Sequence, residues 1–220
     1  MTIEKARYWA ENMTELSKND RLWLNNPVIM QGVGLAPMVV AATSGYTALV
    51  LAVAVAVMLT PTRVVGAVLR KALGEKYNRF AVLCYAFPAA LCYIAAYFLV
   101  RHLWGPSALQ QVGVYLPLLV FEPLIIRRYR AAVPEGPARA LRRGLYTTVG
   151  YLVVLLGVGL ARELLAQGSL MGVQLLDVQL FPLAAQPAGG FMLLGAVCAA
   201  WRGRVRAFKR NIYQEVERNK

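Results

Sequence analysis

The sequence predicts an all-α integral membrane protein with six transmembrane helices that form an inverted repeat of 3+3. Hydrophobic residues make up 58% of the 220 positions, more than an ordinary soluble domain contains. Uncharged runs long enough for a helix to cross a bilayer recur along the chain. They span residues 23–62, 80–100, 103–121, 144–161 and 178–201. These observations favour membrane crossings over the buried helices of a soluble protein.

Positive charge is concentrated between the apolar runs. The net charge is +13, and 22 of the 24 Lys and Arg residues fall within residues 5–21, 63–79, 127–143 and 202–220. This alternation is typical of the positive-inside rule and of loops that face anionic lipid. It argues against a nucleic-acid partner. It also predicts that both termini are cytoplasmic, which agrees with an even number of crossings.

The chain divides into three predicted parts. Residues 1–22 form a cytoplasmic amphipathic segment, which lacks the early apolar core of a cleavable signal peptide. Residues 23–208 form the six-helix domain, with repeat halves at about 26–101 and 110–208, and residues 209–220 form a basic cytoplasmic tail. The expected crossings lie near 26–43, 44–68, 79–101, 110–130, 144–164 and 189–208.

The first and fourth crossings are interrupted by glycine and proline. They read "GVGLAPM" and "GVYLPLLVFEP", and an offset of 80 residues aligns Pro37 with Pro117. Each opens a set of three helices, and the two enter the membrane from opposite sides. Inverted repeats with broken helices around a central site are common in transporters. Gly32, Gly34 and Pro37 are therefore predicted to mark a half-helix break, whereas the alternative is a simple proline kink in a packing helix.

Four motifs give the chain a family resemblance. They are "NPVIMQGVGLAP" at 26–37, "YLPLLVFEPLII" at 115–126, "ARELLAQGSLMG" at 161–172 and "PAGGFMLLG" at 187–195. In order and spacing the chain resembles the RnfE/NqrD-type membrane subunits of the Rnf and Na⁺-translocating NADH:quinone reductase complexes. The resemblance implies a bacterial inner-membrane subunit of a redox-driven ion translocase that is not catalytic alone. It also implies an inverted RnfA/NqrE-type partner and further membrane and flavin-bearing subunits.

The resemblance also implies a [2Fe–2S] cluster between half-helices, with thiolates from a "GLCP" and a "VNC" element. This chain has Ala36 at the first position and Glu122 at the second. An alanine methyl cannot bind iron, and a carboxylate is a harder ligand than the thiolates that such clusters use. We therefore expect no cluster or other metal bound by this chain alone, with flavins and iron–sulfur clusters in partner subunits. The former cluster position comprises Gly34, Ala36, Pro37, Pro117, Glu122 and Pro123.

The three cysteines fall elsewhere in apolar runs. Cys84 and Cys92 are eight residues apart on one predicted helix, about 12 Å along its axis, and Cys198 lies in another helix. A buried cysteine commonly serves as a small hydrophobic residue. We therefore assign all three to packing.

Three charged residues inside the predicted crossings are the remaining candidates, Glu122, Arg162 and Glu163. A carboxylate such as Glu122 is costly there and is a candidate for an ion or proton path, although a place near a helix end or water would leave it merely solvated. Arg162 and Glu163 form a predicted structural pair that locks the half-helices by an ion pair or by backbone hydrogen bonds. The alternative function is non-redox membrane transport, or a scaffold role, with Glu122 in the ion path.

Overall fold

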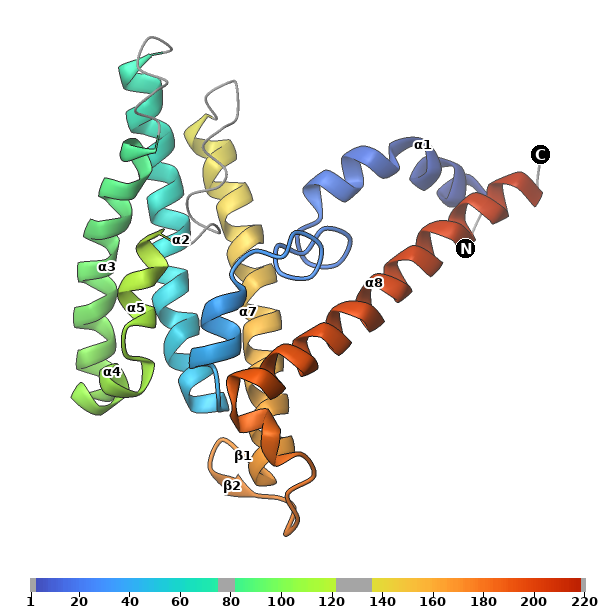
Figure 1. Cartoon of the computed structure of the whole chain (residues 1–220). Coiled ribbons are helices and arrows are strands. Elements are labelled where there is room, and N and C mark those ends of the chain that lie inside the picture. The colour runs from blue at the N-terminus through green and yellow to red at the C-terminus, as the bar shows by residue number, and fades with distance from the viewer. Residues whose placement is uncertain (1–2, 75–81, 122–135, 219–220) are drawn as a thin grey trace.

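The computed structural model describes residues 3–74, 82–121 and 136–218, and most of them are helical. Within these described residues, three helices are long and apolar enough to cross a membrane: α2 (Gly45–Leu73), α3 (Leu83–Trp104) and α7 (Pro137–Gln167). They run side by side as a bundle in which α2 lies between α3 and α7 (Figure 1). The prediction of a helical membrane protein is thereby confirmed, apart from the number and arrangement of its spans.

Local sequence signals define where these helices begin and end. Ser44 and Thr47 form a capping box at the start of α2, and Gly74, with φ of 73°, follows its last residue. Pro137 occupies the first turn of α7, where the missing N–H costs nothing. Gly168 ends α7 in a left-handed conformation with φ of 71°.

Small and hydroxyl side chains allow α2 and α7 to approach closely. The Thr60 and Thr148 hydroxyls are 2.8 Å apart and hydrogen-bonded. A Cβ atom at Gly159 would collide with the Ala48 side chain, and one at Gly144 would press on Thr60 at 3.3 Å. Close packing through small residues is the usual way in which helices associate inside a bilayer.

The first and fourth expected crossings are not continuous helices in the described residues. Hydrogen-bonded turns occupy residues 27–31, and the short π-helix η1 (Pro37–Ala41) is the element that lies between these turns and α2. The fourth segment begins as α4 (Pro106–Val112), α5 (Tyr115–Leu118) and the 3₁₀ turn η3 (Leu119–Phe121). Residues 122–135 lie outside the described residues. The arrangement of six spans as a 3+3 inverted repeat therefore stays a prediction.

A short hairpin, a turn and a long helix follow α7. Strands β1 (Ser169–Leu170) and β2 (Val173–Gln174) form a small antiparallel hairpin after α7, followed by the 3₁₀ turn η5 (Pro182–Ala185). The long helix α8 (Pro187–Arg218) then runs obliquely away from the bundle (Figure 1). It covers both the expected sixth crossing and most of the expected basic tail in one unbroken helix.

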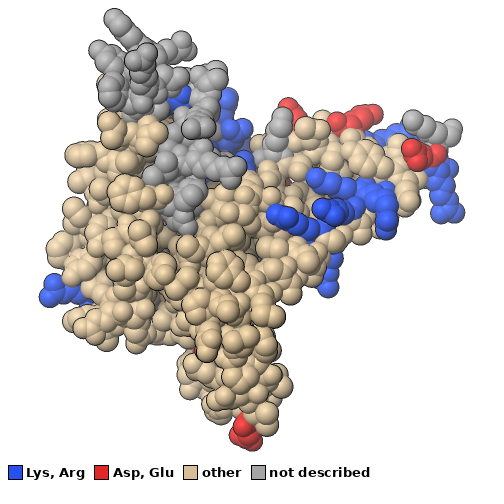
Figure 2. Space-filling view, viewed as in Figure 1, with Lys and Arg blue, Asp and Glu red and all other residues tan. Residues whose placement is uncertain are grey.

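The N-terminal helix α1 (Ile3–Asn19) packs on the distal part of α8. The Trp9 and Phe208 rings meet edge to face with centroids 5.8 Å apart, and Lys209 Nζ donates to Ser17 Oγ at 3.3 Å. Most of the visible Lys and Arg side chains lie over this α1–α8 arm, whereas the visible face of the bundle is largely uncharged (Figure 2).

Candidate functional site

The interrupted segment at 26–43 leaves backbone groups without the partners that a continuous helix would supply. Gly32 and Gly34 have φ of 63° and 76°, so the chain leaves helical geometry immediately before Ala36 and Pro37. The π-helix η1 ends at Ala41, and Ser44 caps α2, which begins at Gly45. Inside a bilayer each of these free carbonyl and N–H groups must be satisfied by protein or trapped water. The helix α7 supplies most of the partners.

Arg162 of α7 closes the carboxyl end of η1. Its Nη1 atom donates to the carbonyl oxygens of Met38, Val39 and Ala42 at 3.1, 2.6 and 2.9 Å. The side chain is completely buried. The carboxyl end of a helix carries partial negative charge, so a guanidinium is the favoured cation there.

The same guanidinium also holds the turn that precedes α8. Its Nε atom donates to Ala184 at 2.9 Å, and Nη2 donates to the carbonyls of Ala185 and Gln186, both at 3.3 Å. Gly190 lets α8 approach this site, because a Cβ atom there would lie 3.0 Å from both Arg162 Cζ and the Val39 oxygen. One side chain therefore joins η1, η5 and α8.

Glu163 binds the amino end of α2, as Arg162 binds the carboxyl end of η1. Its Oε2 atom accepts a hydrogen bond from the Gly45 N–H at 2.7 Å, and Oε1 accepts from the Gly172 N–H at 2.9 Å and the Ser169 hydroxyl at 3.2 Å. The side chain is 3% exposed. A carboxylate is favoured at the positive amino end of a helix. Glu163 thus fixes α2 and the β-hairpin to α7.

Nearer the start of α7, Tyr151 and Gly150 bind the first part of the interrupted segment 26–43. The buried Tyr151 hydroxyl donates to the Gly34 carbonyl at 3.1 Å. Asn26 Nδ2 donates to the Gly150 carbonyl at 2.7 Å, while its Oδ1 accepts from the Val28 N–H at 3.0 Å. Tyr151 and Arg162 are three helical turns apart and so share one face of α7.

Some of the predicted site residues are buried, some are exposed, and two lie outside the described part of the chain. Gly34 and Pro37 are buried in the network around α7, together with the pair Arg162 and Glu163, whereas Ala36 is exposed at the start of η1. Pro117 is exposed in α5, which packs on α3 and α4. Glu122 and Pro123 lie outside the described residues. Among the residues described, no three His, Cys, Asp or Glu side chains gather as a metal site.

Sequence reasoning missed Asn26, Tyr151 and Arg202. Arg202 of α8 donates from Nε to the Ile29 carbonyl at 2.7 Å. Asn26 precedes a proline, a common turn signal, but a single tyrosine in an apolar run or an arginine in a basic cluster has no distinguishing pattern. Their partners become apparent only once the helices are packed.

The fold and this network define a helical integral membrane protein whose broken apolar segment is held by charged and polar side chains of a neighbouring span. Residues 16–198 match the model of a family described as "Rnf-Nqr subunit, membrane protein". The chain belongs to this family.

Relatives resemble the chain over most of its length. A Pseudomonas paraeruginosa protein, named as the E subunit of an ion-translocating oxidoreductase complex, is 32% identical over 209 residues, which cover 86% of this chain and 84% of the relative. Proteins of the same name from Buchnera aphidicola and Shewanella oneidensis are 25% and 28% identical, over 90% and 81% of this chain and 93% and 82% of their own lengths.

Proposed function

We propose that this chain is an integral membrane subunit of an Rnf/Nqr-like ion-translocating oxidoreductase complex, in which it supplies a broken-helix scaffold without iron–sulfur ligands of its own. The family membership and the names of the relatives support the complex. The observation that carries the scaffold role is the network of Arg162 and Glu163, which holds the interruption between η1 and α2 from both sides.

The residue types at the interruption do not fit a thiolate-bound cluster. Ala36 offers only a methyl group at the exposed start of η1. Cys84 and Cys92 belong to α3 and Cys198 to α8, so each sits in a different element from Ala36. In our proposal the sulfur ligands of any cluster come from other chains. We therefore assign this chain no electron-transfer step and place flavins and clusters in partner subunits.

The interruption also suggests where a partner docks. Ala36 and Pro117 are both exposed, one in each broken segment. A pair of broken segments entering from opposite leaflets is the arrangement of an inverted repeat around a central site. In our proposal an inverted homologous subunit covers these positions in a bacterial inner membrane, six spans cross it as 3+3, and both termini are cytoplasmic.

The test is to purify the tagged chain from its native membrane with its bound subunits. We expect flavin-bearing subunits and an inverted homologue to co-purify, and we expect iron and acid-labile sulfide in the complex but not in the chain after separation. Stoichiometric iron and sulfide that stay with the separated chain would contradict the missing ligands. An assembly without flavin or iron would contradict the redox role and favour non-redox transport, for which Glu122 is the sequence candidate.

A further inference from the structure

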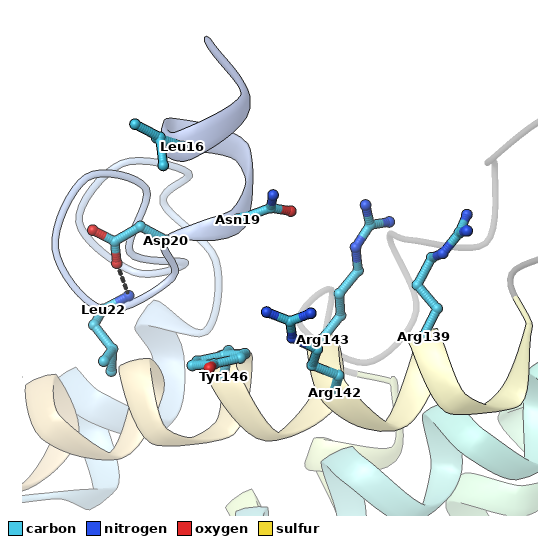
Figure 3. A pocket seen from close by; sticks show the side chains of 8 residues that line it. All are labelled: Leu16, Asn19, Asp20, Leu22, Arg139, Arg142, Arg143 and Tyr146. Carbon is cyan, nitrogen blue, oxygen red and sulfur yellow. Dashed lines mark hydrogen bonds between the residues drawn. The ribbon is translucent and has the colours of Figure 1, made fainter. Parts of the chain in front are cut away.

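A cationic cavity lies between the end of α1 and the first turns of α7, apart from the network around Arg162. Its volume is about 440 Å³. Arg139, Arg142 and Arg143 line it from α7, while Asn19 and Asp20 line the opposite side (Figure 3). Because α7 begins at Pro137, the positive end of its dipole adds to the charge of the three guanidinium groups.

The carboxylate in this cavity already has partners. Asp20 Oδ1 accepts from the Leu22 N–H at 2.9 Å (Figure 3). Oδ1 also accepts from the Trp23 N–H at 3.0 Å, and Oδ2 accepts from the Leu24 N–H at 3.2 Å. It thereby shapes the turn after α1. Among the described side chains that line the cavity, one is negative and three are positive. Arg143 has a contact of its own, which leaves Arg139 and Arg142 opposite one carboxylate. The described lining thus has an excess of positive charge that suits an anion.

An apolar cleft continues from this cavity along α7. Its volume is about 450 Å³, and Leu22, Arg142 and Tyr146 line both spaces. Leu145 and Val149, which are 51% and 46% exposed, extend the cleft toward the middle of the span. The Arg142 guanidinium lies 5.9 Å from the centre of the Tyr146 ring, so this pair forms the boundary between the polar and the apolar space.

We propose that the cavity and the cleft together bind one anionic phospholipid. The phosphate group lies against Arg139 and Arg142, and an acyl chain follows Leu145 and Val149 along α7. A lipid fits better than a free phosphate because a free anion would leave the adjoining apolar cleft unfilled. The order of the two spaces, cationic at the basic end of a span and then apolar, is also the order of a lipid head group and its chain.

The experiment is native mass spectrometry of the full chain in detergent micelles with added dioleoylphosphatidylglycerol, dioleoylphosphatidylcholine or glycerol 3-phosphate. The variant Arg139→Gln/Arg142→Gln is compared with Arg204→Gln/Arg206→Gln, which removes the same charge from exposed positions of α8. The variant Leu145→Asn is compared with Val153→Asn, because Val153 is equally exposed on α7 but does not line the cleft. Circular dichroism verifies that each variant is folded.

We expect phosphatidylglycerol to bind more tightly than phosphatidylcholine, with one lipid retained per chain. The cavity variant should weaken phosphatidylglycerol binding roughly thirtyfold, at about a tenfold loss for each 1.4 kcal/mol and about 1 kcal/mol for each basic residue. Leu145→Asn should weaken lipid binding several-fold, and both control variants should bind like the parent chain.

Three results would overturn the proposal. Equal binding of the two lipids would exclude a site selective for negative charge. Equal losses in the cavity variant and its α8 control would assign the selectivity to net charge alone. Binding of glycerol 3-phosphate as tight as that of phosphatidylglycerol, with no effect of Leu145→Asn, would identify a free-anion site instead of a lipid site.

Discussion

The Nη1 atom of Arg162 donates a hydrogen bond of 2.6 Å to the carbonyl oxygen of Val39, which lies 123 residues earlier in the chain. The next residue, Glu163, accepts a hydrogen bond of 2.7 Å from the Gly45 N–H. One positive and one negative side chain therefore hold the carboxyl end of η1 and the amino end of α2, each opposite the helix end that its charge favours. The connection between those two helices is fixed on both sides by a single turn of α7.

Replacement of Arg162 should destabilise the protein strongly. Arg162→Gln keeps a shorter donor, which cannot reach η1 and η5 at once, so several buried carbonyls lose their partner. Leaving a buried charge network incomplete costs about 3 kcal/mol or more, which corresponds to a fall of roughly 10 °C in the apparent Tm. Thermal unfolding of the purified chain in detergent, followed by tryptophan fluorescence, measures the shift.

Two further variants test whether the loss of stability comes from the Arg162 guanidinium group. Arg162→Lys retains the charge but lacks the planar fork of donors, so it should recover only part of the loss. Arg204→Gln removes an exposed arginine of α8 and should leave the apparent Tm within about 2 °C of the parent. Equal shifts for Arg162→Gln and Arg204→Gln would contradict the role of Arg162.

Glu163→Gln should also destabilise the protein, but less than Arg162→Gln does. A glutamine has one acceptor oxygen, so its amide nitrogen must face either the buried Gly45 N–H or the part-buried Gly172 N–H, and one of the two donors loses its partner. The expected cost is about 1–3 kcal/mol. The control is Glu217→Gln, which neutralises an exposed carboxylate on α8. A Tm for Glu163→Gln equal to that of the control would show that the lost hydrogen bond does not stabilise the fold.

Gly32 and Gly34 share a positive φ and differ in their surroundings, so alanine at each position separates backbone strain from packing. Both have positive φ, so alanine is strained at either position by about 1–2 kcal/mol. A Cβ atom at Gly34 would also overlap the Tyr151 ring, whereas nothing lies within 4 Å of one at Gly32. Gly34→Ala should therefore lower the free energy of unfolding by about 1–3 kcal/mol more than Gly32→Ala does. Chemical denaturation of the two variants in one detergent tests the difference, and the reverse order would refute the packing seen here.

The sequence predicted the long apolar helices and the positions where the chain breaks, because hydropathy, proline and glycine act locally. It also singled out Arg162 and Glu163, because this charged pair belongs to the family motif at 161–172 and lies near the end of an expected crossing. It did not predict which backbone groups they bind. Residues such as Met38 and Ala185 contribute only their carbonyl oxygens, and a carbonyl is common to every residue type. Such hydrogen bonds to backbone carbonyls depend on how the helices pack, and the local sequence does not predict them.

The proposed orientation predicts opposite labelling of the two ends of the bundle. In a chain whose native cysteines are replaced, Asp177→Cys in the exposed loop after β2 should react with a membrane-impermeant maleimide added to intact cells. Arg210→Cys, which is exposed on α8, should react only in inverted membrane vesicles. Labelling of Arg210→Cys from outside intact cells would reverse the orientation that the positive charges predict.

The exposure of Ala36 gives a direct test of partner docking. In the cysteine-replaced background, Ala36→Cys should react with N-ethylmaleimide in the separated chain, because the residue is exposed at the start of η1. In the assembled complex the inverted homologue should cover it, and the labelling rate should fall at least about tenfold, the change expected when access requires local opening worth about 1.4 kcal/mol. Asp177→Cys serves as the control and should react equally in both samples. Equal rates for Ala36→Cys in the chain and the complex would place the partner elsewhere, because a thiol at a covered interface cannot stay as accessible as one in the free chain.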